Sequence, residues 1–512
     1  MAKRFFKSGI LLTLVGLAMR SVAMFFGAFI SRSVGAEGVG IYTMIMTLYT
    51  FAVTMATSGI SLTVTRLVAS AVGEAKHDKV ERVLKGAFIY SFIFGIVTTL
   101  GLFFCADFLG NRILSDDRTV MSLKVLAFSL LPISLSSVIS GYFVGVKRVA
   151  FNAVASVFCQ MLKLVFTVLI VSYLAKFGTV SAVVGICVGI TFTELLGFLL
   201  IFLEFLYDRR KNGVKSKDRH TELSSVSSMA LPLAFSAYVR SILLNIEHIL
   251  IPKKLRERGE NSSEAYAHYG TLHGMALPLI TYPMSPLSSF AGLLVPEFAE
   301  DMAAGRRKRM SYIASRAINA TLAYSMISSV FLFAFAEELG YTVYNSYDAG
   351  YYIAILSTVV PIMYLDHVTD SMLKGVGEHV FSMWVNISDS LLSVILVWLL
   401  IPRMGIMGYA LVIVIMEGYN FALSFYRLRR KIDFKINITA AMMIPLFVSI
   451  LAIRISGKIF RFSGSTSRPL WLGLKIIFAI CIAVILLSFV GFITENLKKK
   501  TSGNKKKKRQ PI

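Results

Sequence analysis

Two arginines interrupt stretches of the chain that are otherwise apolar. Arg20 and Arg240 each lie near the middle of a long hydrophobic segment. A charge at the centre of a membrane helix costs roughly 2.5–3.5 kcal/mol on insertion scales, so such a residue is functional by default. The planar guanidinium keeps its proton and binds phosphate oxygens bidentately. Two such side chains facing one cavity would bind an anion, and a diphosphate would engage both.

A structural alternative is that each arginine pairs with a buried carboxylate and only joins helices. Glu247 lies seven residues after Arg240 on the same helical face and could be that partner. Lys163, in the middle of the fifth apolar stretch with Gln160 one turn before it, could extend a basic wall. Arg66, at the end of the second stretch, could bind phosphate or could anchor the helix at the interface. We therefore predict a substrate site that contains Arg20, Arg240, Arg66 and Lys163.

Acidic and amide side chains gather in the second half of the chain. Asn386, Asp389 and Glu417 lie on the eleventh and twelfth predicted helices. Together with Glu247 on the seventh, their oxygen atoms could coordinate a small hard cation. Such a site would couple transport to sodium ions or to protons, although the spacing does not identify a metal.

A second acidic group lies on the tenth predicted helix. Asp366, Asp370 and Lys374 follow one another at intervals of four residues, and His367 is next to the first of them. This spacing puts the two carboxylates and the ammonium on one helix face. A structural ion-pair ladder is the simplest interpretation of that face.

The sequence contains no recognisable catalytic constellation. The seven histidines are scattered, and no His, Cys and Asp cluster has the spacing of zinc ligands. We therefore expect no enzyme and no cofactor other than a coupling ion. A membrane-embedded scaffold or a polymer ligase is an alternative of another class. A ligase would need a sizeable outer loop, and the longest candidate, residues 253–269, has little room for a fold.

The elements that must position these residues are membrane helices. Of the 512 residues, 56% are hydrophobic and 16% are charged, whereas soluble domains carry roughly 45–50% apolar and about 25% charged residues. A bilayer-spanning helix needs about 20 mostly apolar residues. We expect an all-α integral membrane protein with about 14 transmembrane helices, which begin near residues 8, 38, 86, 120, 151, 180, 228, 269, 312, 351, 380, 405, 438 and 471.

The distribution of positive charge predicts the orientation in the membrane. The formal net charge is +24, and most Lys and Arg residues fall in short loops on one side of the predicted helices. Because cytoplasmic loops are enriched in Lys and Arg, we expect both termini in the cytoplasm of a multi-pass cell-membrane protein. The basic run at residues 505–509 resembles a nuclear signal or an RNA-binding tail. Contact with anionic lipid is the simpler interpretation, so we expect no nucleic-acid partner.

An internal repeat predicts the architecture. Arg20-Ser21 matches Arg240-Ser241, Gly145-Val146 matches Gly375-Val376, and Phe151 matches Phe381. Val64–Val68 aligns with Val295–Ala299, and Pro132 aligns with Pro361. All matches keep one order and a nearly constant separation along the chain. We predict two pseudo-symmetric six-helix lobes enclosing a central cavity, with boundaries at 1–211 for the first lobe, 212–431 for the second, 432–495 for two further helices and 496–512 for a polybasic tail.

The chain resembles the multidrug/oligosaccharidyl-lipid/polysaccharide flippase superfamily, whose members combine two six-helix lobes with, in some, two further helices. The resemblance extends over essentially the whole chain and is closest to the polysaccharide transporter branch, which includes sporulation proteins and lipid II flippases. It is carried by Ser58–Leu62, by Thr65–Val68 and the basic loop after Gly73, by Arg20 and by Val295-Pro296.

The resemblance implies a flippase that moves an undecaprenyl-diphosphate-linked saccharide or peptidoglycan precursor from the inner to the outer leaflet. In that family cavity arginines hold the head group, the lipid tail lies beside the last two helices, here 438–455 and 471–493, and some members bind sodium. A single chain that encloses its own cavity implies a monomer. The alternative is a cation-coupled multidrug exporter of the same fold. Two midplane arginines argue against it, because cationic drugs require an acidic or aromatic cavity.

Overall fold

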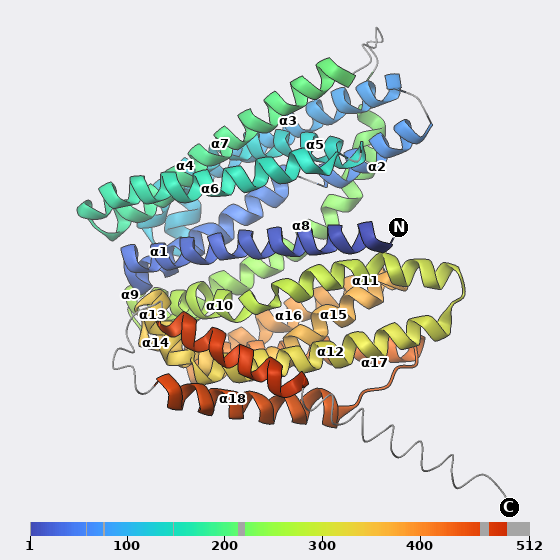
Figure 1. Ribbon diagram of the computed structural model, residues 1–512. Helices are drawn as coiled ribbons and strands as arrows, with labels where there is room; N and C mark the ends of the chain where they lie inside the picture. Colours follow the sequence, from blue (N-terminus) through green and yellow to red (C-terminus); the bar gives the residue numbers. More distant parts are fainter. Residues whose placement is uncertain are drawn as a thin grey trace, which may run out of the picture. The chain divides into compact units, whose positions relative to one another are not determined.

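The computed structural model describes residues 2–57, 59–74, 77–146, 148–212, 221–460 and 471–488 (Figure 1). Within these ranges the chain is helical almost throughout, and no strand occurs among them. The predicted all-α class is therefore confirmed. The predicted polybasic tail, residues 496–512, lies outside the described part of the chain.

Seven α-helices form the described part of the first half. The longest, α1, is bent at Gly35, where a φ of 69° lies in the left-handed region that glycine adopts without a steric penalty. The bend separates two arms of one long helix, so a single helical element contains the first two predicted spans. The helices are α1 (Ala2–Thr57), α2 (Ile60–Gly73), α3 (His77–Phe108), α4 (Val120–Ala127), α5 (Leu130–Gly145), α6 (Val149–Leu174) and α7 (Thr179–Asn212).

The second half begins with a helical segment that is interrupted several times. A π-helical stretch covers Gly270–Ala276, and a 3-10 turn covers Tyr282–Met284. Pro278, Pro283 and Pro286 lie in or beside these interruptions, where a proline removes a backbone hydrogen-bond donor. The helices are α8 (Leu223–Glu257), α9 (Ser262–Tyr269), α10 (Leu277–Thr281), α11 (Ser285–Ala303), α12 (Arg307–Ala334), α13 (Ala336–Tyr344), α14 (Tyr347–Ser357), α15 (Val360–Gly375), α16 (His379–Met404), α17 (Ile406–Lys431), α18 (Ile444–Phe460) and a last helix, Trp471–Ser488.

The count of membrane spans depends on how broken helices are treated. Ten described helices are long and apolar enough to cross a membrane, or up to twelve if each of two bent pairs is one span. One of the ten, Met19–Val72, has 54 residues, whereas a single crossing needs about 20. The interrupted segment from α9 to α11 contributes no span to this count. The predicted total of about fourteen stays a prediction.

Large apolar side chains are widely exposed on the surface of the described helices. Phe104, Phe235 and Trp384 are 72%, 69% and 62% exposed, respectively. A soluble protein rarely exposes contiguous apolar patches of great extent, whereas side chains that face hydrocarbon need no cover. The exposed residues therefore support a multi-pass membrane protein.

The structure repeats the same succession of elements in the second half. Asp117–Ala127 and Leu130–Gly145 form one bent pair at 43°, and Tyr347–Ser357 and Val360–Gly375 form the other at 59°. The same number of residues separates Gly145 from Gly375 and each of the other starts and ends in the first pair from its counterpart in the second. It also separates the start of α6 from the start of α16. The internal repeat that the sequence predicts is therefore present in the fold.

Close packing of two glycines corrects the predicted register of the repeat. A β-carbon built on Gly145 would lie 3.1 Å from the Thr65 carbonyl oxygen, and one built on Gly375 would lie 2.9 Å from the Val295 carbonyl oxygen. These contacts pair Thr65 with Val295, whereas the sequence alignment paired Val64 with it. The prediction was wrong by one residue because apolar side chains match in either register, while helix contact at glycine allows only one.

Each half joins two consecutive helices, α6 and α7 or α16 and α17, with an ion pair, and the polarity of the pair differs between the halves. In the first half, Arg148 before α6 pairs with Asp208 near the end of α7, whose carboxylate also accepts a hydrogen bond of 2.8 Å from Tyr142. In the second half, Glu378 before α16 pairs with Arg427 at 2.9 Å and with Lys431 at 2.6 Å, both near the end of α17. Both halves therefore keep an ion pair at this place, but the acidic and basic partners have changed places between the two helices.

Tertiary contacts divide the chain into two compact units. One comprises residues 17–275 and 386–412, and its main core is formed by side chains of α2, α3, α5, α7 and α8. The other comprises residues 1–16, 276–385 and 413–512, with a core formed by α11, α12, α15 and α17. The lobe boundaries that the sequence predicts, at residues 211, 431 and 495, stay predictions.

Candidate functional site

The two predicted cavity arginines lie on α1 and α8. Arg20 is half-buried, next to Met19 on α1, and Arg240 is exposed on α8. Both belong to the unit that comprises residues 17–275 and 386–412. Arg66 is exposed near the end of α2 in the same unit. The assignment of these three arginines to one anion site stays a prediction.

Lys163, the fourth predicted residue, lines a pocket of about 340 Å³ whose wall is partly polar and partly apolar. The pocket lies within one unit and is formed by α1, α5, α6 and α7, of which α6 and α7 run side by side (Figure 1). Met19 and Gln160 are also in its wall. The Lys163 Nζ atom lies 5.7 Å from the centre of the Phe26 ring, within reach of a cation–π contact.

Sequence reasoning missed the carboxylate that faces this pocket. Glu194 on α7 lines it and interacts electrostatically with Lys163. Three serines of α5, Ser136, Ser137 and Ser140, complete the polar wall. The available signal was a glutamate in the middle of an apolar stretch, which is costly in a membrane helix. Its partner could not be read from the sequence, because it lies on a different helix.

The structure brings together two of the four residues predicted to couple a cation. Glu247 on α8 is buried, and its carboxylate interacts with the Ser393 hydroxyl and the Asp389 carboxylate, both on α16. Asn386 precedes Asp389 by three residues on the same helix. Glu417 is half-buried on α17, in the other unit. In the part of the chain that the structure describes, no group of three or more His, Cys, Asp or Glu side chains could hold a metal ion.

A cluster of aromatic rings adjoins the buried Glu247. The rings of His248 and His273 meet edge to face with centroids 4.5 Å apart, and Tyr269 stacks on His273 at 5.3 Å. The Tyr409 hydroxyl is 3.3 Å from Nδ1 of His273. His273 lies on the π-helical stretch, a type of irregularity that is frequent at functional sites. The histidines are scattered along the sequence, and the fold brings these two together.

The acidic face of α15 has the structural role that its spacing suggests. Lys374 pairs with Asp370 at 2.6 Å, four residues apart on the helix. The Ser382 hydroxyl donates a hydrogen bond to the same carboxylate from α16. The ion-pair interpretation is therefore confirmed for Asp370 and Lys374.

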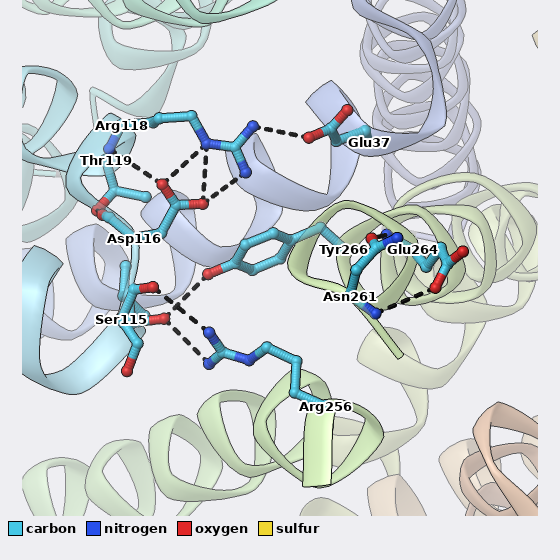
Figure 2. Close-up of polar contacts among 10 residues, drawn as sticks. Glu37, Ser115, Asp116, Arg118, Thr119, Arg256, Asn261, Glu264 and Tyr266 are labelled. Atoms are coloured by element: carbon cyan, nitrogen blue, oxygen red, sulfur yellow. Dashed lines mark hydrogen bonds and ion pairs between the residues drawn. The ribbon is translucent and has the colours of Figure 1, made fainter. Parts of the chain in front are cut away.

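Side chains of α1, of the connection before α4 and of α9 form a polar network in the unit that comprises residues 17–275 and 386–412 (Figure 2). Arg118 donates to both carboxylate oxygens of Asp116, at 2.9 and 2.7 Å, and to Glu37 at 2.7 Å. The Tyr266 hydroxyl, from α9, donates to the Leu114 carbonyl at 3.1 Å. Burial raises the pKa of the Tyr266 phenol to about 12, so it remains a donor at neutral pH. The network fixes the start of α9 against the residues that precede α4.

Residues 253–269, the longest outer-loop candidate of the sequence, are part of this network. Arg256 donates to the Ser115 carbonyl, and α9 begins with a capping box in which Asn261 and Glu264 bond each other's backbone (Figure 2). Apart from residues 258–261, the range 253–269 belongs to α8 and α9. The segment that would have been the outer loop of a ligase is therefore mostly helical.

Two family models match the chain. The model described as polysaccharide biosynthesis protein matches residues 5–302, and the model described as MatE matches residues 273–399. The first match alone includes more than half of the chain.

Two relatives from Bacillus subtilis (strain 168) match most of the chain. Stage V sporulation protein B is 28% identical over 425 residues, which are 81% of this chain and 82% of the relative. Lipid II flippase MurJ is 20% identical over 409 residues, which are 75% of this chain and 74% of the relative.

Solved structures share the fold. The inward closed conformation of lipid II flippase MurJ is 14% identical with a TM-score of 0.72, over 94% of this chain and 98% of that one. The inward-facing conformation of a multidrug resistance MATE family transporter is 16% identical with a TM-score of 0.66, over 82% of this chain and 98% of that one. At these identities the likeness concerns the fold alone. The family match, the relatives and the helical repeat agree, and this chain belongs to the polysaccharide biosynthesis protein family within the multidrug/oligosaccharidyl-lipid/polysaccharide flippase superfamily.

Proposed function

We propose that this protein moves a polyprenyl-diphosphate-linked saccharide or peptidoglycan precursor from the inner to the outer leaflet of the cell membrane. The diphosphate binds Arg20 and Arg240, with Arg66 as a further contact, while the polyprenyl tail stays in lipid. The two halves alternate between inward-open and outward-open states. The protein acts as a monomer with both termini in the cytoplasm.

The observation that carries the proposal is the position of Arg20. This residue is half-buried on a membrane helix, and the preceding residue, Met19, lines a polar pocket. A permanent positive charge on a helix that also lines this pocket favours a ligand that joins an anionic group to a polar head. Lipid-linked diphosphate saccharides have this composition. The family match and the lipid II flippase relative point to the same class of substrate.

Directional transport requires a source of free energy that favours one of the two states over the other. A substrate with equal affinity for both would only equilibrate across the membrane. The buried Glu247 with Asp389 and Ser393 is the site at which a sodium ion or a proton would supply that bias. A cation bound at these carboxylates would favour the state in which they are close together.

A cation-coupled multidrug exporter is a second candidate. The MatE model matches residues 273–399, and MATE transporters share the fold. A cavity for cationic drugs would need to avoid the positive charges of Arg20 and Arg240. Drug efflux from cells that survives Arg20→Ala unchanged would favour this candidate.

Native mass spectrometry of the purified full-length protein tests the proposal. The probe is undecaprenyl-diphosphate-linked N-acetylglucosamine, and undecaprenyl monophosphate serves as the ligand with one phosphate fewer. The proteins are the wild type, the Arg20→Ala/Arg240→Ala double variant and Arg112→Ala. Arg112 is an exposed arginine on the π-helical turn after α3 and is the matched control.

The wild type and Arg112→Ala should bind the diphosphate lipid, and the double variant should lose at least about tenfold in affinity. Tenfold corresponds to about 1.4 kcal/mol, the low end of the range for a single charge-assisted hydrogen bond. Equal binding by all three proteins would mean that these arginines are structural. A wild type that binds neither lipid would remove the basis of the proposal.

A further inference from the structure

The polar pocket of α5, α6 and α7 has a wall of mixed charge. Lys163 lies on α6 and Glu194 on α7, and both line the pocket. The two side chains interact electrostatically. Among the described residues, however, no ion pair with an N···O distance within 4.0 Å joins them. The pocket therefore separates an ammonium from a carboxylate.

Hydroxyl and amide groups occupy the rest of the polar wall. Ser136, Ser137 and Ser140 face the pocket from one side of α5, and Gln160 lies one turn before Lys163 on α6. The Ser137 hydroxyl donates to the Ile133 carbonyl at 3.0 Å, so its lone pairs remain available to accept. A bound molecule would find both donors and acceptors around it.

This combination selects against three classes of ligand. A simple anion would be repelled by Glu194, and a simple cation would be repelled by Lys163. An apolar molecule would bury the charges without hydrogen bonds, which costs free energy. A neutral molecule with several hydroxyl groups suits all the partners, because each hydroxyl both donates and accepts.

The geometry points to a saccharide subsite in this pocket. Hydroxyls of the sugar would donate to the Glu194 carboxylate and accept from the Lys163 ammonium, and such charge-assisted bonds are about twice as strong as neutral ones. A volume of about 340 Å³ is in the range of small-molecule pockets, which starts at roughly 300 Å³. This inference rests on the proposed function and locates the sugar within it.

The position of Arg20 supports the assignment. Met19 lines the pocket, and Arg20 is the next residue along α1. In a sugar diphosphate lipid the saccharide is covalently attached to the diphosphate. A diphosphate at Arg20 would therefore carry its sugar to the neighbourhood of the pocket that Met19 lines.

Two lipids that differ only in the sugar test this inference. They are undecaprenyl diphosphate and undecaprenyl-diphosphate-linked N-acetylglucosamine, titrated against the purified full-length protein. Glu194→Gln removes the charge and keeps the shape of the side chain. Glu204→Gln makes the same change ten residues later on α7, at a half-buried glutamate that does not line the pocket. Thermal unfolding checks that each variant is folded.

The wild type and Glu204→Gln should bind the sugar-bearing lipid about tenfold more tightly than the sugar-free lipid, as one charge-assisted hydrogen bond would give. Glu194→Gln should lose this preference and bind the sugar-free lipid as the wild type does. An equal loss for both lipids, or an unchanged preference, would overturn the subsite while the proposed function stood. Binding of neither lipid by the wild type would overturn the proposed function and the subsite together.

Discussion

The two halves of this chain share a backbone plan in detail. The only two described residues other than glycine with positive φ are Ser115 and Asn345, at 56° and 55°, and they occupy equivalent positions of the repeat. The residue after each, Asp116 and Ser346, caps the next helical turn with its side-chain oxygen. The bent pairs and glycine contacts follow at the same interval.

The same positions carry opposite chemistry in the two halves. The pocket serines Ser136 and Ser140 correspond to Asp366 and Asp370 in the register that pairs Gly145 with Gly375. Lys163 corresponds to Ser393. Polar residues have been kept at these sites while their charge has been changed, so the first half offers hydroxyls and an ammonium where the second half offers carboxylates and a hydroxyl.

This comparison distinguishes features that the repeated fold requires from features that depend on the bound ligand. Close glycine contacts, caps and bends recur because the helix packing depends on them. Charges differ between the halves, and in our account Arg20 of the first half and Arg240 of the second bind a sugar diphosphate, whereas Glu247 and Asp389 of the second half bind a cation. Substitutions at repeated backbone features should therefore have effects of the same sign in both halves.

The largest of these effects should come from the glycine contacts. A β-carbon at Gly375 would lie 2.6 Å from Cβ of Phe298, and one at Gly145 would lie 3.0 Å from Cβ of Val68. Overpacking of this kind costs about 1–3 kcal/mol. Gly375→Ala should lower the thermal unfolding midpoint in detergent more than Gly145→Ala does. Gly292→Ala, with no atom within 4 Å of its β-carbon, is the control and should be neutral. Equal stability of all three variants would contradict the packing described.

Loss of the buried carboxylate in the first half should come next. Asp208 is 3% exposed in its side chain and binds both Arg148 and Tyr142. Asp208→Asn leaves a partly exposed guanidinium without its counter-ion and should cost about 1–2 kcal/mol in the free energy of unfolding. Chemical denaturation of the purified protein measures the change. An unaffected protein would mean that this connection is not needed for stability.

The corresponding pair in the second half should contribute less and should depend on pH. Hydrogen bonds from Lys431 and Arg427 lower the pKa of the Glu378 carboxyl. Because its pKa is below the unfolded value of about 4.3, the stabilisation is present above that pH and is lost as the pH falls through the folded value. Glu378→Gln should cost less than about 1 kcal/mol at pH 7. The difference from the wild type should shrink progressively in melting curves recorded at pH values that fall below about 4.3; a constant difference would contradict the assignment.

The smallest effect should come from the left-handed positions, with the opposite sign. Ser115→Gly should stabilise the protein by about 0.5 kcal/mol, because serine is strained at positive φ and glycine is not. Asn345→Gly should gain less, because asparagine tolerates this conformation. Thermal melts of the two variants measure the order of the gains. Destabilisation by Ser115→Gly would indicate that its side chain has a role beyond the backbone.

The sequence predicted the helices and the repeat well because both are encoded in long-range patterns. Apolar stretches report burial in lipid, and pairs such as Phe151 and Phe381 recur in order. It predicted Lys163 as a binding residue and missed Glu194, since hydropathy along one helix does not say which helix faces it. It also missed the meeting of His248 and His273, which depends on the π-helical stretch between α9 and α10. Side-chain partners across helices are set by packing, and a single sequence does not record them.

Transport itself is the most direct test of the account. Purified protein would be reconstituted into liposomes with fluorescent undecaprenyl-diphosphate-linked N-acetylglucosamine, and an impermeant quencher would report how fast the lipid changes leaflet. The account predicts that the wild type accelerates this exchange over protein-free liposomes and that Arg20→Ala/Arg240→Ala loses at least about tenfold of the acceleration. Exchange by the wild type no faster than in protein-free liposomes would contradict the proposed function, and equal acceleration by the double variant would contradict the arginine site.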